Sequence, residues 1–228
     1  MIYLIIKMAA PMEEEINVSV ENELSRIGQD DQSPLSGTHP SVVERYYTAG
    51  YKTDMNGNSC EDFCILKHSN KVCLITVAKG HPLIRENKKI LKVDFQVGAN
   101  TNRMQNKVVG KRKKGGQWLN QTAQLCKVTC ADGTCYTMSS CINGKLVEVN
   151  ETLLQEPQLI QTRPCGEGYI AIVLPKLGGC DQQMEKLLTP AQYEAVLKAR
   201  LEERKEKGQS TPEDTPSTSE GQSCDTRD

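Results

Sequence analysis

The sequence predicts one mainly β domain over residues 41–207, with polar segments on either side. The first observation is an alternating pattern over residues 125–142, interrupted by Asp132 and Gly133. An Asp-Gly pair tolerates the positive φ angles of a tight turn, so this pattern predicts a β-hairpin. The β-rich residues 62–78 predict a second hairpin. A length of 228 residues with 37% hydrophobic residues fits one domain with tails.

The first predicted strands follow an apolar and aromatic segment that begins near Val42. Residues 62–67 and 72–78 are β-rich runs on either side of a polar turn at 68–71. Another strand is predicted at 90–97, where apolar and polar residues alternate. Several short strands therefore precede the Asp-Gly hairpin along the chain.

A two-residue type I′ turn at Asp132-Gly133 fixes the predicted register of that hairpin. In this register Cys130 faces Cys135, close enough for the two thiols to oxidise, although packed thiols are the commoner outcome. Two opposite faces result, of which one is expected to be core. The first carries Cys126, Val128, Cys130, Cys135, Thr137 and Ser139, and the second carries Lys127, Thr129, Tyr136 and Met138.

Two helices are predicted after the hairpin. Asn150 is placed to cap a short helix of about two turns that ends before Pro157, because proline lacks the backbone donor. Residues 168–175 return to strand, and Thr189-Pro190 starts a helix over about 189–206. A narrow apolar stripe on this last helix is expected to dock on the sandwich. Its cations, Arg200 among them, alternate with acids and predict ordinary surface salt bridges.

Charge is unevenly distributed along the chain, although the net charge is only −1. Residues 1–40 carry seven acidic and two basic side chains, and they are predicted to be a disordered acidic extension. Residues 208–228 carry five acidic and one basic side chain, and this polar, proline-punctuated segment is predicted to be a disordered tail. The middle of the chain is therefore basic, which favours acidic partners.

The sequence gives little support for catalysis, metal binding or membrane insertion. Ten cysteines occur without a secretory signal, which indicates a reducing compartment and thiols packed as small hydrophobes. They lack the paired Cys-x2-Cys spacing of zinc sites, and Cys64 and His68 fall within a predicted strand hairpin, where they would not meet as nucleophile and base. We therefore predict no enzyme activity, no cofactor and no metal. No apolar run approaches the about 20 residues that a membrane span needs.

The strongest candidate for partner binding is a basic run between residues 107 and 118. Glycines flank the cations, and the only tryptophan follows directly. Such a run creates a positive potential beside an aromatic anchor, and it also resembles a nuclear-import signal. The plain alternative is a solvated loop with a core tryptophan. The candidate residues are Lys107, Lys111, Arg112, Lys113, Lys114 and Trp118. Direct nucleic-acid binding is not expected, because no recognition motif or aromatic stacking platform accompanies the run.

The second half of the domain resembles the glycine-cleavage H protein, a lipoyl-type sandwich. The resemblance runs without a gap through Gly144, Val147, Glu148, Asn150, Glu151, Leu153, Pro157, Leu159, Pro164, Gly168 and Tyr169. It implies a lipoyl-like barrel-sandwich hybrid in which the lipoylated lysine of the family falls on Gly133. A glycine offers no amine to acylate, and Lys127 and Lys145 are expected to lie away from the hairpin tip. The resemblance thus implies the fold of a carrier without its attachment residue.

Residues 41–201 also resemble the Abitram family, called Simiate as well. The matching segments include residues 45–47, 60–66, 103–108, 136–141 and 167–176. The resemblance implies a non-enzymatic, actin-binding regulator of filament growth and cell protrusions, with further presence in nuclear speckles and a link to the transcription machinery. Two other functions stay open at this point: a nuclear adaptor for nucleic acid or polymerase, and a degenerate lipoyl-type carrier or adaptor. The family supplies no residues for the actin contact.

Overall fold

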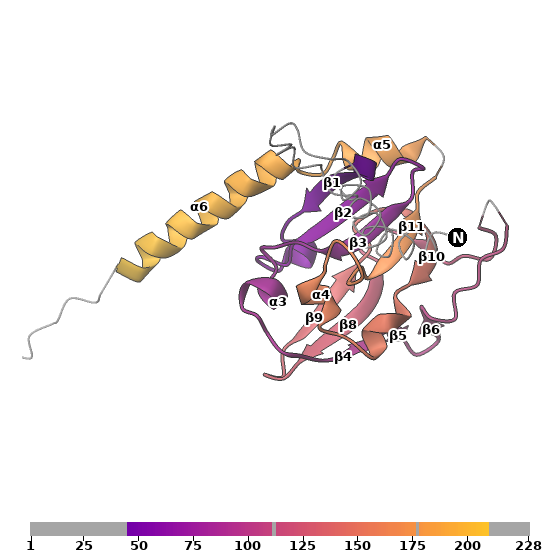
Figure 1. Cartoon of the computed structure of the whole chain (residues 1–228), viewed down its shortest axis with the longest axis horizontal. Helices are drawn as coiled ribbons and strands as arrows, with labels where there is room; N and C mark the ends of the chain where they lie inside the picture. The colour runs from indigo at the N-terminus through magenta and orange to yellow at the C-terminus, as the bar shows by residue number, and fades with distance from the viewer. Residues whose placement is uncertain (1–44, 111–112, 177, 210–228) are drawn as a thin grey trace, which may run out of the picture.

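The computed structural model describes residues 45–110, 113–176 and 178–209. Its strands form three sheets with six, three and two strands, which confirms the mainly β prediction. The six-stranded sheet has the order β1-β2-β3-β11-β10-β7, so early and late strands of the domain meet at its centre. In Figure 1 this sheet lies against the β4-β8-β9 sheet, and α6 extends from the body on the side away from that smaller sheet. The predicted extension 1–40 and residues 210–228 of the predicted tail lie outside the described residues, whereas residues 208 and 209, also assigned to that tail, belong to α6 (Pro190–Gln209).

The predicted hairpin at 62–78 is confirmed. Its strands pair antiparallel with Phe63 opposite Val77, and the backbone N–H of Lys71 donates to the carbonyl of His68 in the turn. Two edge strands were not predicted from the sequence: one before this hairpin and one at Trp118. The six strands are β1 (Tyr47–Lys52), β2 (Phe63–His68), β3 (Cys73–Val77), β11 (Ala171–Leu174), β10 (Gly144–Val149) and β7 (Trp118–Leu119).

The predicted strand at 90–97 is two strands, because the strand is interrupted at Phe95. The Asp94 carboxylate accepts a hydrogen bond from the backbone N–H of Gln96 at 2.9 Å, and Phe95 is buried. The three-stranded sheet consists of β4 (Ile90–Asp94), β8 (Gln124–Cys130) and β9 (Cys135–Ser139). The small sheet pairs β5 (Gln96–Gly98) with β6 (Thr101–Asn102).

The Asp-Gly hairpin forms, but its turn differs from the predicted one. The N–H of Gly133 donates to Cys130 O at 3.1 Å, and the N–H of Cys130 donates to Thr134 O at 2.9 Å. The loop therefore has three residues, Ala131 to Gly133, with Gly133 at φ 80° in the left-handed position that such loops require. The predicted two-residue turn is wrong because Ala131 joins the loop.

This extra loop residue shifts the register by one and overturns the predicted pairing of Cys130 with Cys135. Cys135 lies opposite Thr129, and since neighbouring residues of a strand point to opposite faces, Cys130 is buried while Cys135 is exposed. Tyr136 and Met138 instead lie opposite Val128 and Cys126, so they belong to the inner face.

The six-stranded sheet is buried on both faces. On one face Phe63, Ile75 and Leu146 belong to the main core, together with Leu125 and Cys126 of β8. A second cluster on the other face includes Leu66, Leu74, Ile172 and Tyr193 of α6. Strands of a sheet that is covered on both faces consist of continuous apolar residues, which explains why apolar and polar residues alternate little in β2 and β3.

The segment after β10 contains shorter helices than predicted. Asn150 acts as the predicted cap, because its side chain accepts a hydrogen bond from Thr152 N at 3.2 Å, but it caps a single turn. Its amide group also donates to the carbonyls of Glu167 and Tyr169, at 2.6 and 2.9 Å, and so ties this segment to the residues that precede β11. The short helices of the domain are η1 (Met55–Gly57), α3 (Pro82–Arg85), η2 (Glu151–Leu154), α4 (Leu159–Thr162) and α5 (Gly179–Met184).

Gly168 is required by close packing rather than by a turn. A Cβ atom at this position would lie 1.9 Å from the carbonyl oxygen of Leu159, well inside van der Waals contact. The N–H of Gly168 also donates to Arg163 O at 2.9 Å. The glycine therefore lets the chain turn back closely behind α4 before β11 begins.

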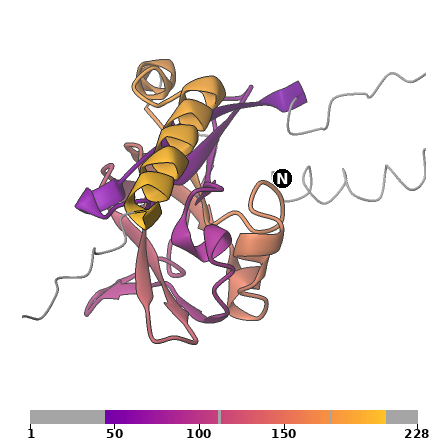
Figure 2. The same ribbon diagram turned by 90° about the vertical axis from the view of Figure 1, so that its left-hand side faces the viewer.

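The C-terminal helix α6 (Pro190–Gln209) contacts the body from its N-terminal cap as far as Arg204, whose guanidinium lies 3.7 Å from the sulfur of Cys60. The Thr189 hydroxyl accepts from Gln192 N at 3.4 Å, as the predicted N-cap, and the buried Tyr193 stacks on Tyr51 with 4.3 Å between ring centres. Leu201, which belongs to the predicted docking stripe, is 56% exposed. Figure 1 shows the start of α6 near β1 and its later turns leading away from the body, and in Figure 2 the same helix lies in front of the body.

Arg200 on α6 is part of a buried ion pair, which corrects the prediction of ordinary surface salt bridges. Its guanidinium lies 2.6 Å from the carboxylate of Asp62 and 2.8 Å from that of Asp54. Asp62 is fully buried and also accepts from the Tyr193 hydroxyl at 2.9 Å. The pair therefore fastens α6 to the connection between β1 and β2.

Candidate functional site

The hairpin tip, residues 131–133, is the place where the resemblance to a carrier puts the modified lysine. A Cβ atom built on Gly133 would meet nothing within 4 Å, so the position faces open space. The geometry therefore offers room for a side chain that projects from the tip. Glycine at this position provides no amine to carry a group.

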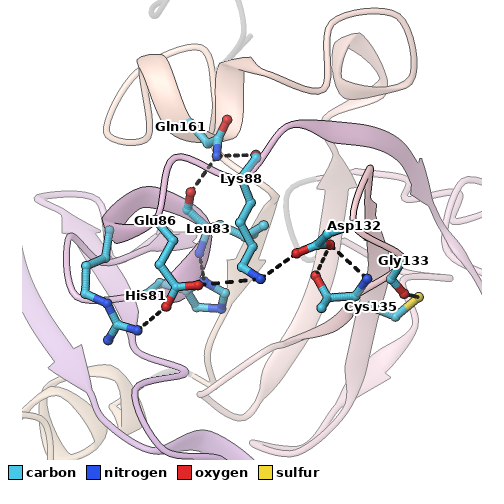
Figure 3. A network of polar contacts seen from close by, with 10 residues as sticks. His81, Leu83, Glu86, Lys88, Asp132, Gly133, Cys135 and Gln161 are labelled. Carbon is cyan, nitrogen blue, oxygen red and sulfur yellow. Dashed lines mark hydrogen bonds and ion pairs between the residues drawn. The ribbon is translucent and has the colours of Figure 1, made fainter.

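Sequence reasoning missed the amine that lies beside the hairpin tip. Lys88 is 44 residues from Asp132 in the sequence, yet its Nζ lies 2.6 Å from the Asp132 carboxylate (Figure 3). The same Nζ lies 3.5 Å from the Glu86 carboxylate and 5.9 Å from the centre of the Tyr136 ring. No local pattern connects Lys88 with the hairpin, since only the folded chain brings them together.

Lys88 is held as a structural cation. The side chain of Lys88 is 17% exposed, and its hydrogen bond to Asp132 raises the pKa of the ammonium group. The same bond, with the hydroxyl and N–H of Thr134, holds the pKa of Asp132 well below its usual range. A protonated amine has no free electron pair for acylation, and this one points back to the hairpin instead of into solvent.

A layer of hydrogen bonds holds the backbone around Lys88. Gln161 of α4 donates through Nε2 to the carbonyls of Leu83 and Lys88, at 2.5 and 2.7 Å. His81 caps α3, because its Nδ1 accepts from Leu83 N at 3.2 Å. Figure 3 shows these groups as one continuous polar layer between α4 and the hairpin. The layer therefore fixes the segment that carries Lys88.

The buried His81 has no catalytic geometry. It is fully buried, its Nε2 has no hydrogen-bond partner among the described residues, and its ring lies edge-on to Phe63 and Tyr136. Burial lowers the pKa of His81 to about 4, with the Asp62 carboxylate opposing and Arg85 adding to the decrease. The imidazole is therefore neutral at physiological pH and serves as a cap within the core.

The predicted basic run forms part of a surface at the β7 edge of the large sheet. We call this the basic surface, defined by Lys107, Lys113, Lys114, Trp118, Lys145 and Lys176. Lys111 and Arg112, also predicted for partner binding, lie outside the described residues. The loop is closed by two backbone hydrogen bonds between Val109 and Lys114, at 2.9 and 3.0 Å. The predicted lysines on both sides of this loop are thereby brought close together.

Trp118 is 50% exposed, which overturns its alternative interpretation as a core residue. The core residue of β7 is its neighbour Leu119, which is fully buried. Trp118 lies opposite Lys145 of β10, whose Nζ donates to Lys113 O at 3.4 Å. The Nζ of Lys176 lies 5.3 Å from the centre of the indole ring, which places a cation over its face.

A groove of about 540 Å³ runs beside the indole ring. None of its lining residues is acidic, and the exposed Val109 and Met104 add apolar surface nearby. Interface centres combine such aromatic and cationic side chains with polar rims. The groove is lined by Asn100, Thr101, Asn102, Arg103, Gln105, Asn106, Lys107, Gly115, Gln117 and Trp118.

Within the ranges 45–110, 113–176 and 178–209, no group of three His, Cys, Asp or Glu side chains is arranged to hold a metal ion. In the same ranges, no helix combines the length and apolar character of a membrane span.

Comparisons with known proteins connect the chain to two groups. The family model described as "Glycine cleavage H-protein" matches residues 80–200, which establishes the lipoyl-like barrel-sandwich fold predicted above. The human Protein Abitram is 49% identical, covering 71% of this chain and 90% of that protein. The proteins of the same name from Danio rerio and Drosophila melanogaster are 47% and 44% identical, covering 71% and 72% of this chain and 91% and 73% of those proteins.

A solved structure was found as well. The crystal structure of a glycine cleavage system H protein from Mycobacterium marinum is 17% identical, with a TM-score of 0.44. The match covers 65% of this chain and 95% of that chain.

Proposed function

The chain belongs to the family of proteins named Abitram, and its residues 80–200 belong to the glycine cleavage H-protein family; we propose that it is a non-enzymatic docking protein built on a carrier fold. The observation that carries this proposal is the bare hairpin tip at Gly133. A carrier needs a projecting amine, and the tip residue of this hairpin has no side chain. The fold then serves as a rigid body for binding a partner.

The neighbouring amine does not replace the missing lysine. Lys88 is paired with Asp132 and Glu86, and its side chain is mostly buried against the hairpin. Acylation would remove its charge and leave Asp132 without its partner, which disfavours the modified state. Intact-mass measurement of the chain from cells that lipoylate other proteins is expected to give the unmodified mass. An added lipoyl group on any lysine would contradict the proposal.

The partner in this proposal is actin, whose filament is acidic, and the contact surface is the basic surface. The exposed indole would supply an apolar anchor, while the surrounding lysines would attract the acidic filament. In the cell the protein would regulate actin polymerisation and protrusions from the cytoplasm. A nuclear pool at speckles, associated with the transcription machinery, completes the proposal, with the basic run at 111–114 as its import signal.

Filament cosedimentation tests the contact directly. We expect Lys107→Glu with Lys114→Glu to weaken binding by about tenfold at low salt, corresponding to about 1.4 kcal/mol. Lys127→Glu with Lys186→Glu makes the same change in net charge at exposed positions outside the basic surface, and it serves as the matched control. Equal loss in both double variants would indicate only a net-charge effect and would exclude the basic surface as the contact.

A nucleic-acid binding assay distinguishes the alternative function of a direct nucleic-acid adaptor. Binding to a duplex or single strand in the absence of actin, with affinity falling steeply with salt, would favour that function. We expect full-length protein to bind filaments and to show no comparable affinity for nucleic acid. The opposite ranking of affinities would replace actin as the proposed partner.

A further inference from the structure

Two cysteines from distant parts of the chain meet in the folded protein. Cys73 begins β3 and Cys180 lies in α5, 107 residues later, with 3.8 Å between their sulfur atoms. Both residues are almost fully buried, at 1% and 3% exposure. Sulfur atoms in this contact need to move by about 1.8 Å to reach the length of a disulfide bond.

Both cysteines belong to the main apolar core, but charged side chains lie beside this pair. Lys67 lies opposite Cys73 in the β2–β3 register, and its Nζ reaches the carboxylate of Asp181 at 2.9 Å. Lys71 contacts the same carboxylate at 2.8 Å, so two ammonium groups flank the residue that follows Cys180. Positive charge near a thiol favours the thiolate, the form that attacks oxidants and disulfides.

The two thiols are unequal in acidity. The hydrogen bond from Cys73 lowers the pKa of Cys180 to about 7, helped by the charges of Lys67 and Lys71, while burial and the Asp181 carboxylate oppose the decrease. The pKa of Cys73 is raised, first by its hydrogen bond to Cys180 and then by burial. A thiolate beside a protonated thiol is the arrangement of an attacking and a resolving cysteine. By contrast, burial alone dominates the raised pKa of Cys126 and Cys141.

We propose that Cys73 and Cys180 form a reversible dithiol–disulfide site that tethers α5 to β3 under oxidation by a peroxide. In the first step the Cys180 thiolate attacks one peroxide oxygen, the O–O bond breaks, and the sulfur becomes a sulfenic acid while hydroxide leaves and is protonated to water. In the second step Cys73 attacks that sulfur, and the S–O bond breaks as the disulfide forms. The hydroxide that leaves combines with the proton of Cys73, so two thiols and one hydrogen peroxide give one disulfide and two waters.

The tether would act on the segment that leads to α6. Gln183 of α5 exchanges two hydrogen bonds with the backbone of Asn143, at 2.6 and 3.1 Å, and the backbones of Leu188 and Tyr51 exchange two more at 2.9 Å each. These contacts hold the chain between α5 and α6 on the sheet without a covalent bond. A disulfide would add one covalent connection across 107 residues, which restricts the unfolded chain strongly.

Peptide mapping of the full-length protein tests the proposal. Trypsin cleaves after Lys71, Lys79, Lys176 and Lys186, so residues 72–79 and 177–186 are separate peptides with one cysteine each. The reduced protein is treated with graded hydrogen peroxide, alkylated, and digested without reductant. We expect these two peptides joined, with a mass lower than their sum by two hydrogens, and separated again by dithiothreitol.

Variants and a melting curve give independent readouts. Cys180→Ser is expected to abolish the joined peptide, whereas the exposed Cys135→Ser, the matched control, is expected to leave it unchanged. Oxidation should raise the melting temperature of the control by about 10 °C and leave that of Cys180→Ser unchanged.

Three outcomes would overturn the proposal, and none requires a variant that folds. One is two unjoined peptides at a peroxide dose that already oxidises the exposed Cys135 and Cys165. Another is sulfinic acid on Cys180 without any joined peptide. The third is a disulfide confined to the peptide at residues 128–145, which contains Cys130, Cys135 and Cys141.

Discussion

Acid should destabilise this protein through His81 before it protonates most carboxylates in the folded state. The imidazole is fully buried and its pKa is lowered to about 4, against about 6.5 for an exposed histidine. Between these two values the unfolded chain binds a proton that the folded chain does not. The contribution of the neutral His81 to the free energy of unfolding is therefore fully present above the pKa of the unfolded chain. It decreases as the pH falls toward the pKa of the folded chain.

The size of this effect follows from the two pKa values. A difference of about 2.5 pKa units corresponds to at most about 3.4 kcal/mol, of which about 3 kcal/mol should be lost by pH 4 and about 2 kcal/mol by pH 5. The full value applies because water has no access to the side chain. Asp62 and Arg85 are the charged groups that act on the ring, and they act in opposite directions.

Urea denaturation of the protein and of His81→Asn, measured from pH 7 to pH 4, isolates this contribution. Asparagine is a good N-cap, so the variant keeps a side-chain acceptor for Leu83 N but has no group that titrates. The variant is expected to be less stable than the original protein at pH 7, because the smaller side chain leaves space in the core. It is expected to lose less unfolding free energy between pH 7 and pH 4. Parallel curves of unfolding free energy against pH for the two proteins would refute the buried, neutral histidine.

Three further substitutions test the packing of the domain. Arg200→Ala should cost about 3 kcal/mol in urea denaturation, because it leaves the buried carboxylate of Asp62 unpaired; Asp62→Asn in the same chain should restore part of the loss. Gly168→Ala should cost about 3 kcal/mol, since the added methyl group meets the carbonyl of Leu159, and an unchanged melting temperature would contradict the close approach. Gly133→Ala should cost only about 1 kcal/mol, all of it from the positive φ angle, because nothing lies near the added atom.

The sequence predicted the elements whose signals are local. The turn residues between β2 and β3 and the caps Asn150 and Thr189 define structure within a few residues, and all appear at the predicted places. The Asp-Gly turn was predicted at the right place but with the wrong length, because Ala131 can belong to the strand or to the loop with similar local geometry. Whether Ala131 belongs to the strand or to the loop determines which cysteines lie on the same face of the hairpin.

Features that depend on contacts between distant segments were not predictable. The pair of Lys88 with Asp132 and the pair of Arg200 with Asp62 join residues 44 and 138 apart in the sequence. Nothing in either local pattern distinguishes these cations from ordinary surface charges. The same holds for the contact between Cys73 and Cys180, whose sequence context resembles that of any buried cysteine.

Binding and stability should be separable in this molecule, because the residues proposed for each lie at opposite edges of one sheet. The basic surface is built on β7 and its neighbour β10, whereas α6 and its ion pair are attached at β1. Lys107 and Lys114 are exposed, so their reversal should lower filament binding without changing the melting temperature. Arg200→Ala should do the reverse, since it acts on the attachment of α6 to the β1–β2 connection, at the sheet edge opposite the indole. A loss of both properties in either variant would show that α6 and the β7 edge form a single binding unit.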